Sequence, residues 1–127
     1  ELTLTADVGA AKRIGLRVRH GQAAVTEITC DVSARTLSVD RRRSGESAFF
    51  DGFAAVHTAP VLLDQDRLNL HVFLDTCSVE VLADDGLVAL SDLVFPQDAL
   101  MTLELFADGE VMIQSLELWT LHALFTD

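Results

Sequence analysis

Apolar and polar residues alternate along most of the chain with a period of two, and almost no segment shows the 3.6-residue period of a helix. In the segment RIGLRVRH, for example, Ile14, Leu16 and Val18 share one face, and arginines occupy the other. A period of two places successive side chains on opposite faces of a strand. The pattern therefore predicts an all-β protein whose strands have one buried face and one wet face.

Ten strands are predicted from this alternation and from the turns between the alternating segments. Turns at HGQ, ADDG and ADGE supply the positive-φ residues that tight hairpins require. The alternation lapses over residues 41–53, which predicts a loop there. Short strands at regular spacing are typical of a sandwich or barrel. The predicted strands are Leu2–Val8, Arg13–His20, Ala24–Val32, Thr36–Asp40, Val56–Leu63, Leu68–Asp75, Ser78–Ala83, Leu87–Leu93, Met101–Ala107 and Val111–His122.

The length of 127 residues and the hydrophobic fraction of 50% predict one domain, residues 1–127, with a single core. No apolar run approaches the roughly 20 residues that cross a bilayer, and the first residues lack the pattern of a signal peptide. Cys30 and Cys77 have the spacing of neither a zinc site nor a disulfide framework, so we expect two free thiols. Alternation places Cys30 in the core.

The formal net charge of -11 argues against nucleic acids and anionic membranes as partners, because both repel an acidic surface. Seven of the eight arginines and the only lysine lie at or before Arg43, whereas the later residues carry fifteen acids and only Arg67. The basic cluster DRRRSG, residues 40–45, is interpreted either as a source of ion pairs or as a solvated loop.

The sequence offers no pattern for a metal or a cofactor. Histidines 20, 57, 71 and 122 are scattered, and no glycine-rich loop precedes a helix to hold phosphate. The segment DQDRLNLHVFLD imitates the start of a calcium loop, but Asn69 stands where glycine is required. We therefore expect no metal and no cofactor.

Five blocks in a fixed order resemble the C-terminal β-sandwich of glycoside hydrolase family 32, which includes invertases, levanases and inulinases. The related carbohydrate-binding module family 66 is similar. The resemblance implies a two-sheet antiparallel β-sandwich of the jelly-roll or concanavalin-like kind, fructan or sucrose as the substrate class, and an attached propeller that performs hydrolysis. It favours an extracellular location if the parent is a secreted enzyme. The blocks are VDRRRSG (39–45), FFDGFAAVHTAP (49–60), LHVFLDTCSVEVLADDG (70–86), LSDLVFP (90–96) and LELW (116–119).

The chain also departs from the family pattern. The family usually has Asp-Arg-Ser-Ser before Val-Glu-Val, whereas this chain has Asp-Thr-Cys-Ser at residues 75–78, so a bidentate donor is lost. The family nucleophile lies in an Asn-Asp-Pro motif, but the only asparagine here, Asn69, precedes leucine. A glycosidase needs two facing carboxylates, and three outward acids, Asp40, Asp75 and Glu80, are candidates for them. The resemblance nevertheless implies that this domain is not an enzyme.

The candidate carbohydrate site consists of five residues from the matching blocks. Family resemblance and outward alternation indicate Asp40, Arg41, Asp75 and Glu80, with His57 as an additional donor. Carboxylates accept hydrogen bonds from neighbouring hydroxyls of a terminal fructose, and arginine donates a fork of them. We expect these side chains on one shared exterior. The alternative interpretation is a structural ion pair that links strands, between Arg41 and either Asp75 or Glu80, contributing about 0–1 kcal/mol.

Two functions follow from the resemblance. The first is a non-catalytic module that binds the end of a fructan such as levan or inulin and serves a tethered glycoside hydrolase. The second is a structural domain that packs on a propeller or a second subunit and binds no sugar. An apolar patch around Phe73, Leu82, Phe95 or Trp119 would favour the second. Trp119, the only tryptophan, is expected to pack in the core or against another domain.

Overall fold

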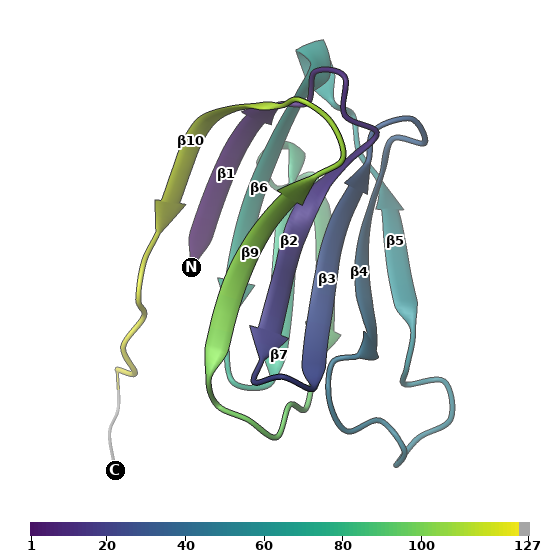
Figure 1. The fold of residues 1–127 in the computed structure, drawn as a ribbon, viewed down its shortest axis with the longest axis vertical. Coiled ribbons are helices and arrows are strands. Elements are labelled where there is room, and N and C mark those ends of the chain that lie inside the picture. Colours follow the sequence, from purple (N-terminus) through teal and green to yellow (C-terminus); the bar gives the residue numbers. More distant parts are fainter. Residues whose placement is uncertain (125–127) are drawn as a thin grey trace.

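The computed structural model describes residues 1–124 and consists of two five-stranded antiparallel sheets packed face to face (Figure 1). Sheet A has the strand order β10-β1-β6-β7-β8, and sheet B has the order β5-β4-β3-β2-β9. The predicted two-sheet antiparallel sandwich is thereby confirmed. In chain order the strands are β1 (Leu2–Asp7), β2 (Arg13–His20), β3 (Ala24–Asp31), β4 (Thr36–Arg43), β5 (Val56–Pro60), β6 (Arg67–Leu74), β7 (Ser78–Ala83), β8 (Val88–Leu93), β9 (Met101–Ala107) and β10 (Met112–Leu118).

The observed strands differ from the predicted ones mainly at three ends. Strand β4 runs on to Arg43, whereas β5 stops at Pro60 and β10 stops at Leu118. Beyond β5 the chain turns away through Leu63, whose φ of 49° is left-handed. Strand β10 ends where its neighbour β1 begins, because Leu118 is paired with Leu2. Alternation of residue types therefore predicts where the strands lie. It does not predict the residue at which each strand ends, because that depends on the neighbouring strand.

Helical structure is confined to two short 3-10 turns in the described part of the chain, Asp64–Asp66 and Asp84–Gly86. The second turn uses left-handed backbone at Asp84, Asp85 and Gly86, as the ADDG pattern predicts. Within residues 1–124, no helix has the length and apolar character needed to cross a membrane.

The core lies between the sheets and is filled by alternate residues of both. Cys30, which alternation places inside, is fully buried. Each large apolar side chain removed from water in this way contributes roughly 1.5–3 kcal/mol to the hydrophobic driving force for folding. The largest fully buried side chains are Leu4, Ile14, Leu16, Ile28, Leu37, Leu63, Leu68, Val8, Val18, Val39, Val72 and Val79.

The two lateral sides of the sandwich differ. On one side, β8 of sheet A contacts β4 and β5 of sheet B, so the sheets are closed together. On the other side lie the edge strands β9 and β10, whose inward-facing Leu105 and Leu116 are still 37% and 48% exposed. Their cross-strand partners Leu16 and Leu4 are buried. The core is therefore covered on the closed side and accessible on the open side, between β9 and β10.

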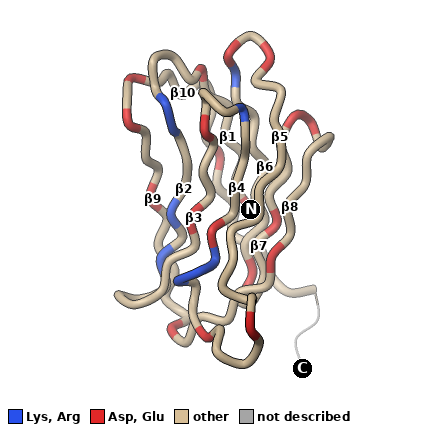
Figure 2. Tube along the Cα trace, turned by 90° about the vertical axis from the view of Figure 1, so that its right-hand side faces the viewer, with Lys and Arg blue, Asp and Glu red and all other residues tan. Residues whose placement is uncertain are grey.

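Basic residues are concentrated along the strands of sheet B (Figure 2). Several of them pair with acids on its outer face. The Arg17 guanidinium lies 3.0 Å from carboxylate oxygens of both Glu27 and Glu104, and Arg19 also contacts Glu104 at 3.1 Å. Hydrogen bonds from Arg19 and Arg17 hold the pKa of Glu104 below its usual value. The arginines that alternation places outward are thus engaged in cross-strand ion pairs.

Thiol reactivity tests the placement of the two cysteines. Cys30 is buried and Cys77 is exposed, and both are free. Burial raises the pKa of the Cys30 thiol from 9.0 to about 11. We expect a thiol-specific chromogenic reagent to modify Cys77 alone in the folded protein, and both residues after unfolding in urea.

The variant Cys77→Ser is the control, and it should show no native-state reactivity. Rapid modification of both thiols in the folded protein would contradict the buried position of Cys30.

The Cys30 thiol ionises at higher pH in the folded protein than in the unfolded chain. Ionisation of Cys30 therefore leaves the free energy of unfolding unchanged below pH 9.0. Stability then falls as the pH rises from 9.0 toward 11.

Candidate functional site

The structure separates the five predicted site residues into three places. Asp40 is on the outer face of sheet B, and Glu80 is on the outer face of sheet A, with Asp75 just beyond the end of β6. Arg41 and His57 lie together on the closed side. The expectation of one shared exterior is therefore wrong. Strands β4 and β7 belong to different sheets, and the core lies between their outward-facing acids.

Asp40 forms an ion pair with a neighbour on its own strand. Arg42 donates from Nε to Oδ1 at 3.0 Å and from Nη2 to Oδ2 at 2.6 Å, which is a two-pronged ion pair. The side-chain hydrogen bonds from Arg42 lower the pKa of Asp40. Both carboxylate oxygens of Asp40 are thus satisfied within the strand.

Arg41 points inward, to the same side of β4 as buried Leu37 and Val39. Its Nη1 lies 3.3 Å from Oδ1 of Asp92 on β8 and donates to the Leu93 carbonyl oxygen at 3.2 Å. The Asp92 side chain is 1% exposed. Burying a carboxylate so completely requires a charged partner, and Arg41 supplies it. The predicted ion pair of Arg41 with Asp75 or Glu80 is therefore wrong, because Arg41 pairs with Asp92.

His57 of β5 completes this network. Its Nδ1 is 2.6 Å from the same Asp92 oxygen, and its side chain is 46% exposed. His57 therefore lies in a strand, as the sequence predicts, and contacts a buried acid of the other sheet. We call Arg41, His57 and Asp92 the inter-sheet clamp, because they join β4 and β5 of sheet B to β8 of sheet A.

An aromatic cluster covers the clamp. The Arg41 guanidinium carbon lies 3.9 Å from the centre of the Phe53 ring, a cation-π contact. Phe53 in turn lies against Phe49 and Phe95, with ring centres 4.8 and 5.6 Å away. The loop after β4 is thereby fixed over the clamp. Within residues 1–124, Asp92 Oδ2 and Arg41 Nε are buried without a hydrogen-bond partner.

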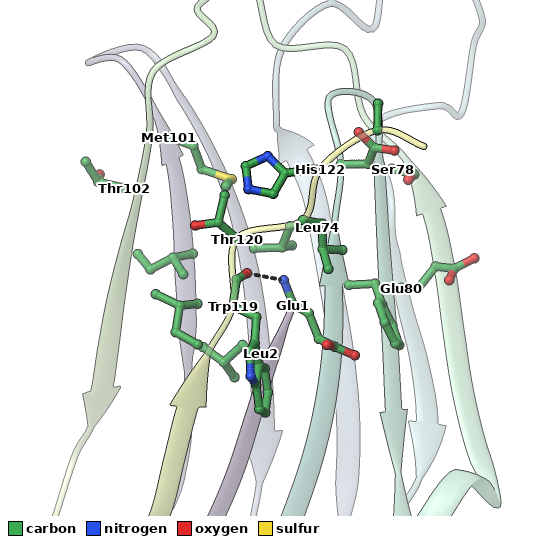
Figure 3. Close-up of a pocket in the computed structure, with 16 residues that line it drawn as sticks. Glu1, Leu2, Leu74, Ser78, Glu80, Met101, Thr102, Trp119, Thr120 and His122 are labelled. Atoms are coloured by element: carbon green, nitrogen blue, oxygen red, sulfur yellow. Dashed lines mark hydrogen bonds between the residues drawn. The ribbon is translucent and has the colours of Figure 1, made fainter. Parts of the chain in front are cut away.

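Residues Asp75 and Glu80 line a groove of about 1040 Å³, which we call the end groove. It lies where β1 begins, β6 ends and β7 begins, with the segment after β10 passing along it (Figure 3). Its lining residues are Glu1, Leu2, Phe73, Leu74, Asp75, Ser78, Glu80, Met101, Thr102, Leu103, Leu118, Trp119, Thr120, Leu121, His122 and Ala123.

Aromatic rings and carboxylates alternate across sheet A at this groove. Trp119 donates its backbone N–H to the Glu1 carbonyl oxygen at 2.8 Å, and Figure 3 shows the two residues side by side. Phe73 is the cross-strand partner of Glu80. Because Leu2 pairs with Val72, Glu1 is the neighbour of Phe73. The order across the sheet is thus Trp119, Glu1, Phe73 and Glu80.

The sequence predicts only part of this arrangement. Trp119 is 42% exposed, so it does not pack in the core, and its packing against another domain stays a prediction. Alternation indicates that Glu80 points outward, but it does not show that Glu1, Phe73 and Trp119 lie beside it. Asp92 was missed as well. The sequence does contain a signal for Asp92. It follows Leu90 by two residues in an alternating strand, so it faces the core on the same side as Leu90.

The part of the chain that the structure describes contains no group of three or more His, Cys, Asp or Glu side chains arranged to hold a metal ion. The chemistry that the end groove offers is hydrogen-bond acceptance beside apolar rings. Three carboxylates, from Glu1, Asp75 and Glu80, line it together with Phe73 and Trp119, and no lysine or arginine is among the lining residues.

The contribution of the inter-sheet clamp to the free energy of unfolding can be tested by mutation. Replacing Arg41 with methionine keeps much of the side-chain volume but leaves the Asp92 carboxylate buried without its charged partner. We expect the free energy of unfolding to fall by about 3–5 kcal/mol, measured by urea denaturation. The matched control is Arg42→Met, which breaks the exposed pair with Asp40 and should change stability little. Equal effects of both variants would contradict the clamp.

Comparison with known proteins identifies relatives of the whole sandwich. The family model for the C-terminal domain of glycosyl hydrolases family 32 matches residues 1–120. A levanase of Bacillus sp. (strain L7) is 32% identical over 120 residues, which are 94% of this chain and 13% of that protein. A levanase of Bacillus subtilis (strain 168) is 35% identical over 118 residues, 91% of this chain and 17% of that protein.

A solved structure has the same fold. The exo-inulinase from Aspergillus awamori superimposes with a TM-score of 0.79 and 25% sequence identity, covering 91% of this chain and 23% of that one. The chain thus spans less than a quarter of the length of these relatives. On the match over residues 1–120, the chain belongs to the C-terminal β-sandwich domain family of glycoside hydrolase family 32.

Proposed function

We propose that this domain is non-catalytic and binds the terminal fructose of a fructan, such as levan or inulin, in the end groove. The observation that carries the proposal is the alternation of two aromatic rings and two carboxylates across one end of sheet A. In this role the domain serves a family 32 hydrolase in the same polypeptide and raises the local concentration of its substrate.

The chemistry of the end groove suits a neutral sugar. Carboxylates of Asp75 and Glu80 accept hydrogen bonds from neighbouring hydroxyls, while the rings of Phe73 and Trp119 pack on the C–H face of the sugar. Glu1 offers one oxygen, because its Oε2 lies 2.8 Å from Nε2 of His71. An anionic ligand is disfavoured, because no arginine or lysine lines the groove and the chain carries a net charge of -11. A volume of about 1040 Å³ is ample for a small saccharide.

The relatives support a fructan as the ligand class. Two of them are named levanase and one is named exo-inulinase, and each is several times longer than this chain. We place the hydrolytic step in the part of such enzymes that this chain does not include. Asp40, Arg41 and His57 take no part in this proposal, because Arg42 and Asp92 already engage them.

Calorimetric titration tests the proposal. We expect the domain to bind fructose and levan-type oligosaccharides, and the variants Glu80→Gln and Asp75→Asn to weaken binding by about tenfold or more. A hydrogen bond to a charged group contributes about 1.5–3 kcal/mol, which is consistent with that loss.

The matched control is Glu110→Gln, which removes an equal charge from the turn between β9 and β10, outside the end groove. It should bind as the unmodified domain does. No heat with fructose, levan or inulin at millimolar concentration would refute sugar binding, and an equal loss in all three variants would refute the assignment to the groove.

A second function, structural packing, is favoured by the open side of the sandwich. Several apolar side chains of β10 and of the following residues are exposed, and they include the only tryptophan. Exposed patches of this kind commonly mark protein interfaces. The exposed fractions are 62% for Met112, 38% for Ile113, 48% for Leu116, 64% for Leu118, 42% for Trp119 and 56% for Leu121.

The packing function predicts different behaviour of the isolated domain and a longer protein. Leu116→Glu should change the melting temperature of the isolated domain little, because the side chain is half-exposed. In a polypeptide that also carries a family 32 catalytic domain, it should lower the melting temperature by several degrees, since a charge is then buried. The control is Ser115→Glu on the outward face of β10. A melting temperature unchanged in the longer protein would exclude packing at Leu116.

A further inference from the structure

The end groove is the first of three depressions that share lining residues. A second depression of about 330 Å³ shares Leu74, Asp75 and Met101 with the end groove, and we call it the bridge depression. A third, of about 800 Å³, is the distal depression. It shares His20, Gln97, Asp98 and Ala99 with the bridge depression. The three depressions therefore follow one another around one end of the sandwich.

This end is built from loops of both sheets. The turn between β2 and β3, the loop after β4, the turn between β6 and β7, and the connection from β8 to β9 all lie there, at the lower end in Figure 1. The bridge depression lies under the β8–β9 connection, and the distal depression lies between that connection and the loop after β4. A ligand that lies along this end would cross from one sheet to the other.

His20 is the buried polar group on this path. It continues the inward face of β2 after Val18, and it is 6% exposed. Its Nδ1 has no hydrogen-bond partner among the described residues, although His20 lines both the bridge and the distal depressions. A buried polar atom without a partner is costly, so an unmatched ring nitrogen beside a depression indicates a place for a hydroxyl group.

The distal depression combines donors and acceptors. Arg43 lines it and takes part in no ion pair within residues 1–124. Gln22 and Gln97 add two amide side chains, and Glu46 and Asp98 add two carboxylates. One oxygen of each carboxylate accepts backbone N–H groups, which leaves the other oxygen free for a ligand. Sugar hydroxyls, which both donate and accept, match such a mixture.

The walls of the distal depression are fixed by contacts between loops. The backbone N–H of Glu46 donates to the Phe95 carbonyl oxygen at 2.9 Å. The preceding Gly45 has a φ of +135°, and a Cβ atom there would lie 2.2 Å from the same oxygen. Only glycine permits this approach. The depression is therefore held in shape by the docking of the loop after β4 on the β8–β9 connection.

We propose that the three depressions form one extended site, in which the chain end occupies the end groove and the following fructosyl units occupy the bridge and distal depressions. This inference rests on the proposed function and deepens it. The domain then prefers long fructan chains to free fructose, because each added unit makes further hydrogen bonds along the path.

The test is calorimetric titration with fructose and with linear fructo-oligosaccharides of defined and increasing length. For the unmodified domain, we expect affinity per chain to rise by about tenfold from fructose to the longest ligand. In Arg43→Gln and in Gln97→Ala, this gain should shrink about three- to tenfold, while the affinity for fructose stays unchanged. Lys12→Gln is the matched control, since Lys12 is an exposed cation outside all three depressions.

The outcomes separate the two proposals. Equal affinity for fructose and long oligosaccharides would overturn the extended site and leave the end groove intact. A length-dependent gain that survives in both Arg43→Gln and Gln97→Ala would also overturn it. Loss of fructose binding in Glu80→Gln together with no length dependence would support the end groove alone, whereas no binding of any ligand would overturn both. Urea denaturation of each variant confirms that it is folded.

Discussion

The structure depends on the burial of one side chain in every two between a pair of sheets. This constraint decides where each polar group can lie, because an outward residue of sheet A and an outward residue of sheet B are separated by the whole core. Asp40 and Glu80 both obey the alternation, and for that reason they point in opposite directions. A binding site can therefore form only within one outer face or around the ends of the strands, where the loops of both sheets meet.

The sequence is sufficient to predict the strands and the direction of their side chains, but not the sheet to which a strand belongs. Alternation correctly placed Cys30 inside and Arg17 outside, since each of these depends on one strand alone. Strand order depends on pairing between distant segments, such as β1 with β6 and β10. A period of two carries no information about that pairing, so it gives no basis for placing Asp40 beside Glu80.

The inter-sheet clamp contains one residue, Asp92, whose need for a partner is predictable from alternation alone. An acid at an inward position, such as Asp92, must be paired or neutral, and that rule needs no knowledge of the fold. The identity of its partners needs the fold, because Arg41 and His57 come from β4 and β5 of the other sheet. Resemblance to the family drew attention to Arg41 and His57 as sugar ligands, whereas the structure assigns them to the closed side of the sandwich.

The difference between the closed and open sides also bears on how the domain fluctuates. With the clamp on one side and edge strands β9 and β10 uncovered on the other, separation of the sheets costs least where those two strands lie. Transient breathing motions should therefore begin at this margin, and amide hydrogens of β9 and β10 should exchange with solvent sooner than those of β3 and β6, the middle strands of the two sheets.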